Sequence, residues 1–332
     1  MASSLESQQP KKPSKQAPKP EFKFGIGEWY GKSFVDLTGD QRRQFAAIQS
    51  MPRELRPKQL CPFLSQPGKP VNCHKEGGIC SLRSYERSRL TGTVTLDSRG
   101  SPLVTTCPSR FEQDRIIYSW VNEIVLPNHT AIPIGETPFL RRAPNLDTSK
   151  SGRREVGRMD NVLVVPGSDP LMWCTIEKQA VYFSGKKMAL EFEAISKTTD
   201  NALPFPLESR RPDFRSSSAK RLLPQLETKV PSLSKWAKKM AVVVDAEFFA
   251  QFAPMKAEEH ISLAEILWFV VEYELVETQF VLRPRSVSMT TLESSIAGVI
   301  AATPIPLPEF EQAIRARLQT KLAAQENQAA KR

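Results

Sequence analysis

The stretch DNVLVVPGSDPLMWCTIEKQAVYF, residues 160–183, decides how the rest of the sequence is interpreted. It holds two apolar runs, 161–165 and 171–183, which are separated by a Pro-Gly-Ser-Asp-Pro segment. Short apolar runs rich in β-branched and aromatic residues are typical of strands, and Pro and Gly are typical of the turns between them. The stretch therefore predicts a β-hairpin.

Acidic and amide side chains occupy defined places in this hairpin. Asp160 directly precedes the first run, and Glu177 and Gln179 lie inside the second. Strand side chains alternate, so Glu177 and Gln179 share a face from which Lys178 points away. If Asp160 and Glu177 converge, their oxygens can hold Mg²⁺, and Gln179 can position an attacking water. The alternative is that Asp160 only ends a turn and Glu177 is a solvated strand residue.

The elements around the hairpin indicate a mixed α/β fold. Ser109 and Glu112 form a capping-box pattern before a helical apolar periodicity that ends at Pro127. Residues 241–245 read as a short strand, and 308–325 as an amphipathic helix. Residues 265–275 are apolar enough for either a buried strand or a helix. Alternating strands and helices favour an α/β core.

Composition limits the class of protein. Lys and Arg outnumber Asp and Glu by 46 to 36, which gives a net charge of +10 and favours a polyanionic partner such as nucleic acid. No apolar run is long enough to span a bilayer and no signal peptide is recognisable, so we expect a cytoplasmic protein without membrane contact. Residues 1–20 are polar and basic and read as a disordered tail.

Four of the five cysteines, Cys61, Cys73, Cys80 and Cys107, fall in a segment that is poor in apolar periodicity. Four thiolates can form a tetrahedral site for zinc or iron, and a metal can replace a hydrophobic core in a small module. There is no C-x-x-C pair, and four buried free thiols are the alternative. Cys174 is expected to pack as a small apolar residue.

Two basic runs flank the hairpin in sequence. Residues 208–221 read as a polar loop that can contact phosphates and base edges, and a second run lies just before Asp160. The alternative for both is a solvated surface loop. The candidate DNA-contacting residues are Arg153, Arg154, Arg158, Arg210, Arg211, Arg215, Lys220 and Arg221.

These motifs together resemble one family. Asp160, the E-x-Q of residues 177–179 and the FSG of 183–185 are similar to the active-site hairpin of the NotI-type restriction endonucleases. CPFL at 61–64, GGIC at 77–80 and TCPSR at 106–110 are similar in order and character to the metal-bound module of that family. The resemblance covers roughly residues 24–250.

The resemblance implies a PD-(D/E)xK core, a mixed sheet flanked by helices, over residues 111–332, preceded by a four-cysteine module within residues 21–110. It implies Asp160 and Glu177 as magnesium ligands, and Gln179 where most such nucleases have lysine. Glu136 is the candidate for a further acidic residue, and the cysteines are implied to hold iron or zinc. The resemblance also implies specific cleavage of double-stranded DNA by a homodimer, and a companion DNA methyltransferase in the same system.

Two other functions stay open at this point, and a third is disfavoured. The protein can be a metal-finger DNA-binding protein with an inert hairpin, or a nuclease of DNA repair or processing. An HNH-type nuclease needs a close histidine pair, which His74, His129 and His260 do not supply locally.

Overall fold

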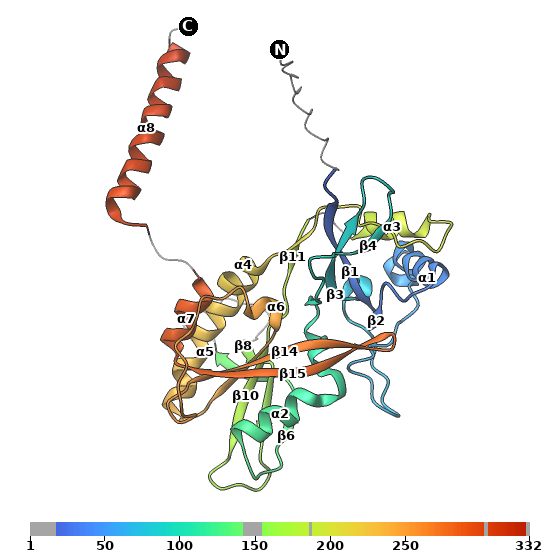
Figure 1. The fold of residues 1–332 in the computed structure, drawn as a ribbon. Coiled ribbons are helices and arrows are strands. Elements are labelled where there is room, and N and C mark those ends of the chain that lie inside the picture. Colours follow the sequence, from blue (N-terminus) through green and yellow to red (C-terminus); the bar gives the residue numbers. More distant parts are fainter. Residues whose placement is uncertain (1–17, 142–154, 186–187, 302–304, 330–332) are drawn as a thin grey trace, which may run out of the picture.

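The computed structural model describes residues 18–141, 155–185, 188–301 and 305–329 (Figure 1). The predicted tail therefore lies almost wholly outside the described residues. Two main sheets organise the chain, one formed by the N-terminal region and one by the later strands. The fold is mixed α/β, as predicted.

The second sheet has six strands and contains the predicted hairpin. Its strands β10, β13 and β14 are parallel, whereas β6, β9 and β15 run antiparallel to their neighbours, so the sheet is mixed. In spatial order the strands are β15 (Gln279–Thr290), β14 (Ile266–Val276), β13 (Met240–Asp245), β10 (Trp173–Lys178), β9 (Asn161–Val164) and β6 (Ile132–Ile134).

The predicted hairpin is confirmed as the antiparallel pair β9 and β10. Its register pairs Trp173 with Val164 and Ile176 with Asn161. Strand β10 ends at Lys178, earlier than the apolar run suggested, because the chain leaves the sheet there. The strand predicted at 241–245 is confirmed as β13, and the ambiguous segment 265–275 is strand β14.

Helices cover both faces of this sheet. Val242 and Val244 of β13 belong to the core beneath α5 (Leu223–Lys235) and α7 (Leu292–Ile300), whereas Ala241 and Val243 face the core beneath α2 (Ile116–Val125). A central parallel strand is buried on both faces, which explains why its sequence is continuously apolar.

The helix predicted from Ser109 begins later than its capping pattern indicated. A 3-10 helix (Pro108–Arg115) comes first, and it is interrupted by non-helical backbone at Gln113 and Asp114 before α2 begins. Glu112 does not turn back to cap the backbone, because its carboxylate pairs with Lys178 and accepts a hydrogen bond from Tyr118. Tertiary contacts thus override a local capping signal.

The N-terminal sheet is built around a long antiparallel pair. Helices α1 (Gly39–Ser50) and α3 (Ala189–Ser196) pack on each other beside it, and its core includes Trp29, Tyr85 and Phe192. Trp29 stacks on Phe192 at a centroid separation of 5.2 Å. Its strands are β1 (Glu21–Trp29), β2 (Lys32–Ser33), β3 (Ile79–Arg87), β4 (Val94–Leu96) and β5 (Val104–Thr105).

Several shorter elements complete the chain. Two-stranded ladders join β7 (Thr137–Arg141) to β8 (Glu155–Met159) and β11 (Phe183–Ser184) to β12 (Arg211–Pro212). The remaining helical segments are 3-10 turns Arg53–Leu55 and Glu76–Gly78, α4 (Phe214–Ser217), a π-helical segment (Ser218–Leu222), α6 (Ala246–Phe249) and α8 (Leu307–Ala329).

The C-terminal helix α8 confirms the prediction for 308–325. It extends away from both sheets in Figure 1, and its first 18 residues are exposed. In the described part of the chain, no helix combines the length and the apolar character that a membrane crossing requires.

A buried ion pair connects the two sheets. Arg110 and Glu28 are both fully buried, with Nε 2.9 Å from Oε2, and the guanidinium also donates to the Phe280 carbonyl at 2.9 Å. Glu28 belongs to β1 of the N-terminal sheet and Phe280 to β15 of the second sheet. One guanidinium therefore bridges the two parts of the protein.

We expect Arg110→Met to lower the free energy of unfolding by about 3–5 kcal/mol, because it leaves the Glu28 carboxylate buried without its cation. Urea unfolding measures the loss. Arg283→Met is the control: Arg283 forms a half-exposed pair with Glu274, and its loss should cost less than about 1 kcal/mol. Equal losses in the two variants would contradict a bridging role for Arg110.

Candidate active site

The end of the β9–β10 hairpin brings Asp160 and Glu177 together. The backbone N–H of Asp160 lies 3.4 Å from Oε1 of Glu177, and the backbone N–H of Lys178 donates to Oδ2 of Asp160 at 3.1 Å. Asp160 directly precedes β9, and Glu177 is the penultimate residue of β10. The antiparallel register therefore places the two carboxylates side by side, as the sequence predicted.

Glu177 is buried and is paired with a lysine from helix α5. Its side chain is only 3% exposed, and Lys229 Nζ lies 2.7 Å from its Oε1. Burial and the neighbouring Asp160 raise the pKa of Glu177 to about 7, although Lys229 opposes the shift. The ionised form of such a poorly solvated carboxylate is stabilised by any additional cation nearby.

On the opposite face of β10, Lys178 reaches a different carboxylate. Its ammonium pairs with Glu112, which also accepts a hydrogen bond from the Tyr118 hydroxyl at 2.8 Å. Burial raises the pKa of the Tyr118 hydroxyl most, and the negative charges of Glu112 and Asp160 raise it further. Glu112 therefore belongs to the electrostatic surroundings of Asp160 although the two are far apart in sequence.

The oxygen donors of the site fit a hard divalent cation. The donors are the two carboxylates. Asn161, whose buried Oδ1 has no hydrogen-bond partner among the described residues, pairs with Ile176 and therefore lies on the other face of the hairpin, in a hollow lined by Glu112 and Tyr118. Carboxylate and amide oxygens are the ligands that Mg²⁺ prefers. Gln179 is buried just beyond β10, where its Nε2 donates to the Ala180 carbonyl at 2.6 Å.

Glu136 is not drawn into the carboxylate pair. Its side chain is exposed, and its carboxylate accepts from Arg158 at a distance of 2.9 Å. Strand β7, which begins at the next residue, pairs with β8, which ends just before Asp160, so the backbone brings Glu136 near the hairpin. A role for Glu136 as the further acidic residue therefore stays a prediction.

The basic segment at 208–221 differs from its prediction in two ways. It folds into β12, α4 and the π-helical turn, so it is not a loop. Arg210 is buried, with its guanidinium 2.7 Å from Glu191, because this ion pair anchors β12 beside α3. The expectation that Arg210 lies on a DNA-facing surface is therefore corrected.

The other basic candidates that fall in the described residues are exposed. Tyr182 links them to the site: its backbone N–H donates to Ser217 Oγ at 2.9 Å, and its ring contacts the Arg221 guanidinium. Tyr182 lies three residues after Gln179, so the basic surface follows the candidate site directly. The exposed cations are Arg158, Arg211, Arg215, Lys220 and Arg221, whereas Arg153 and Arg154 lie outside the described residues.

Backbone contacts bring the four N-terminal cysteines together as two pairs, Cys80 with Cys107 and Cys61 with Cys73. The Cys107 N–H donates to the Cys80 carbonyl at 3.2 Å, and a backbone bridge beside Cys61 brings Cys73 to the same segment. Burial raises the pKa of Cys61, Cys73 and Cys80, and neighbouring cysteines of the set add to each shift. These thiols are thus within electrostatic range of one another.

The expected closed four-cysteine cage is nevertheless not formed. Within the described ranges, no group of three or more His, Cys, Asp or Glu side chains is arranged to hold a metal ion. Cys174 is fully buried in the core of the second sheet, as expected.

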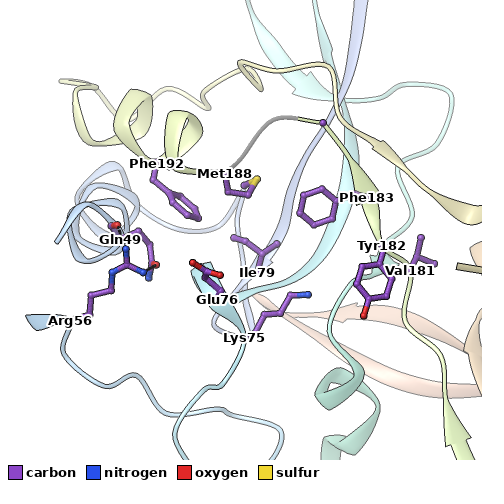
Figure 2. Close-up of a pocket in the computed structure, with 13 residues that line it drawn as sticks. Gln49, Arg56, Lys75, Glu76, Ile79, Val181, Tyr182, Phe183, Met188 and Phe192 are labelled. Atoms are coloured by element: carbon purple, nitrogen blue, oxygen red, sulfur yellow. Dashed lines mark hydrogen bonds between the residues drawn. The ribbon is translucent and has the colours of Figure 1, made fainter. Parts of the chain in front are cut away.

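A cavity of about 540 Å³ lies apart from the carboxylates. Figure 2 shows that residues of the N-terminal region, among them Arg56 and Lys75, surround it together with Tyr182, Phe183 and Phe192. Its lining combines aromatic rings with positive charges. Neither Asp160 nor Glu177 lines it, so the cavity is separate from the candidate active site.

Two residues of the site were missed by sequence reasoning. Glu112 was interpreted as a helix cap, and Lys229 was not singled out. Lys229 does carry a signal: it interrupts an apolar stripe formed by Leu226, Val230 and Leu233 on one face of α5. A charged residue in such a stripe is costly unless it meets an opposite charge.

The raised pKa of Glu177 predicts a pH effect on stability in EDTA. An unfolded glutamate has a pKa of about 4.3, so the folded protein binds more protons than the unfolded chain between about pH 4 and 7. Stability contributed by this group therefore falls as pH rises through that window. We expect the free energy of unfolding of the wild type, relative to Glu177→Gln, to fall by on the order of 1–3 kcal/mol between pH 5 and 8.

Urea unfolding at a series of pH values measures this difference. Glu274→Gln, which changes a side chain that is 59% exposed, should follow the wild type throughout. Parallel curves for the wild type and Glu177→Gln would refute the perturbed titration.

Comparison with known proteins assigns the chain to a family. None of the curated proteins compared with the chain matches it. The family model described as restriction endonuclease NotI matches residues 47–280, well over half of the chain. The matched range includes the four cysteines, Asp160, Glu177, Gln179 and Lys229. The chain therefore belongs to the NotI restriction endonuclease family, a family of DNA-cutting enzymes.

Proposed function

We propose that the protein is a magnesium-dependent restriction endonuclease that hydrolyses double-stranded DNA at a specific site. The observation that carries the proposal is the contact between Asp160 and Glu177 at the end of the hairpin, next to a buried ammonium group. A buried carboxylate with a raised pKa next to a second carboxylate, in a protein of a DNA-cutting family, favours metal-assisted hydrolysis.

In the proposed mechanism, Asp160 and Glu177 hold the metal through their oxygens. Bound magnesium would supply a Lewis acid that acidifies a water and offsets charge on the scissile phosphate. Gln179 positions the attacking water by hydrogen bonding.

The exposed cations beside the site are proposed to bind the DNA backbone. Arg211, Arg215 and Arg221 lie on the segment that hydrogen-bonds to Tyr182, close in sequence to Gln179. Contacts of Lys and Arg with phosphates raise affinity and make it depend on salt. We further propose a homodimer that matches a palindromic site, and a companion methyltransferase that protects host DNA.

The central test is cleavage of a large plasmid or phage DNA in Mg²⁺. The wild type should give discrete fragments, whereas Asp160→Asn and Glu177→Ala should cleave at least ~100-fold more slowly, because each removes a metal ligand. Both variants should still shift labelled DNA in Ca²⁺, since the basic surface is unchanged.

Glu274→Gln is the matched control, because its exposed carboxylate pairs with Arg283 between β14 and β15 and not with the hairpin. It should cleave within a few-fold of the wild type. Random degradation by the wild type would indicate a repair or processing nuclease. Intact DNA with retained binding would indicate a DNA-binding protein without activity.

The cysteine site is proposed as a place where iron or zinc binds and draws the four thiols together. Support comes from the buried, mutually interacting thiols and from the preference of thiolates for these metals. Such a metal would stabilise a region in which the chain between β2 and β3 contains only one helix and two short 3-10 turns.

Elemental analysis of the purified protein tests this proposal. We expect about one zinc or iron per chain, and its loss together with a lower melting temperature in Cys80→Ser. Cys174→Ala is the control, because Cys174 lies in the other core, and it should keep its metal. Wild-type protein with no bound metal would show that the four thiols are simply buried.

A further inference from the structure

Helix α5 buries a charge where an apolar side chain would pack. Leu226, Val230 and Leu233 form its buried stripe, and Lys229 lies in that stripe with its side chain only 6% exposed. Taking an ammonium group out of water costs several kcal/mol unless a partner compensates. A leucine or methionine would fill the same position without that cost, so the charge itself requires an explanation.

The side chains that contact the Lys229 ammonium group indicate its role. Its Nζ lies 2.7 Å from Glu177 Oε1 and 3.0 Å from Gln225 Oε1. Gln225 is one turn earlier on the same helix, so it holds the ammonium in place. The contact with Glu177 spans 52 residues of sequence and joins α5 to the carboxylate pair.

The neighbours of Glu177 on its own strand do not provide this positive charge. Lys178 points to the other face of β10, where it pairs with Glu112. Gln179 is neutral, and its amide group donates to the Ala180 carbonyl. The ammonium that contacts the carboxylate pair therefore comes from α5 and not from β10.

The Lys229 ammonium group changes the net charge of the metal-loaded site. Asp160 and Glu177 with a divalent ion sum to zero, whereas the same set with Lys229 is positive by one. A phosphodiester under attack by hydroxide gains a second negative charge, and a fixed cation stabilises that charge best where water is excluded. The carboxylate pair alone would hold the metal more tightly, but it would attract the phosphate less.

We infer that Lys229 is the resident cation of the active site, supplied by α5 in place of a lysine on β10. This inference rests on the proposed nuclease function and adds a residue to it. The ammonium orients Glu177 through Oε1 and makes the metal-loaded site net positive toward the scissile phosphate. A purely structural ion pair would stabilise the fold but would have no such effect on the reaction.

The test compares Lys229→Gln with a variant that keeps the positive charge. We expect Lys229→Gln to cleave about 100-fold more slowly in Mg²⁺. The conservative variant Lys229→Arg, which keeps a positive charge on α5 and leaves Gln179 in place, should retain roughly tenfold more cleavage than Lys229→Gln. Lys235→Gln changes an exposed lysine near the end of the same helix and should cleave like the wild type.

A second measurement does not depend on cleavage. Mn²⁺ is titrated by calorimetry into the DNA-free protein, with circular dichroism and melting temperature checked for each variant. Removing the ammonium should tighten Mn²⁺ binding on the order of tenfold, because the carboxylates lose a competing positive charge. Tighter metal binding with slower cleavage is a combination that simple loss of folding does not produce.

The outcomes separate this inference from the proposed function. Wild-type protein that binds Mn²⁺ but never cuts DNA would refute the nuclease, whatever the variants do. Wild-type cleavage with equally fast cleavage by Lys229→Gln would overturn the role of Lys229. So would a Lys229→Gln protein that folds but binds Mn²⁺ more weakly, or a Lys229→Arg protein that keeps the wild-type melting temperature but cleaves no faster than Lys229→Gln.

Discussion

Strand β10 is constrained from both sides, and the candidate site depends on that constraint. It pairs antiparallel with β9 and parallel with β13. These two ladders fix its register and the face of the sheet on which each of its side chains lies. A shift by one residue would exchange its two faces, moving Glu177 to the side now occupied by Lys178. The hydrogen-bonded ladder thus fixes which carboxylate meets Asp160 and which cation meets Glu112.

The same strand end concentrates charges that would be unfavourable alone. Glu177 and Lys229 are buried, and Asp160 adds a second carboxylate beside them. A buried ion pair of this kind contributes little net stability, because desolvation offsets the attraction. Its presence in a largely apolar sheet supports the proposed role of these charges in metal-assisted hydrolysis.

The N-terminal region is joined to the second sheet by buried polar contacts. Arg110 contacts Glu28 on one side and the Phe280 carbonyl on the other. Asp245 at the end of β13 accepts from the Thr105 N–H at 2.7 Å. The cysteine region and the carboxylate site therefore belong to one connected structure, and the family match likewise spans both.

The sequence by itself determined the hairpin, the central strand, the terminal helix, the convergence of Asp160 with Glu177, and the family. The hairpin, the strand, the helix and the convergence follow from local periodicity and short-range register, which neighbouring residues encode, whereas the family follows from the resemblance of short motifs. Only the tertiary structure decided that Arg210 is buried, that Glu112 faces Lys178 and that Lys229 reaches Glu177. These contacts join residues from 19 to 66 positions apart. Helix packing and solvent exclusion select such partners, and no local pattern specifies them.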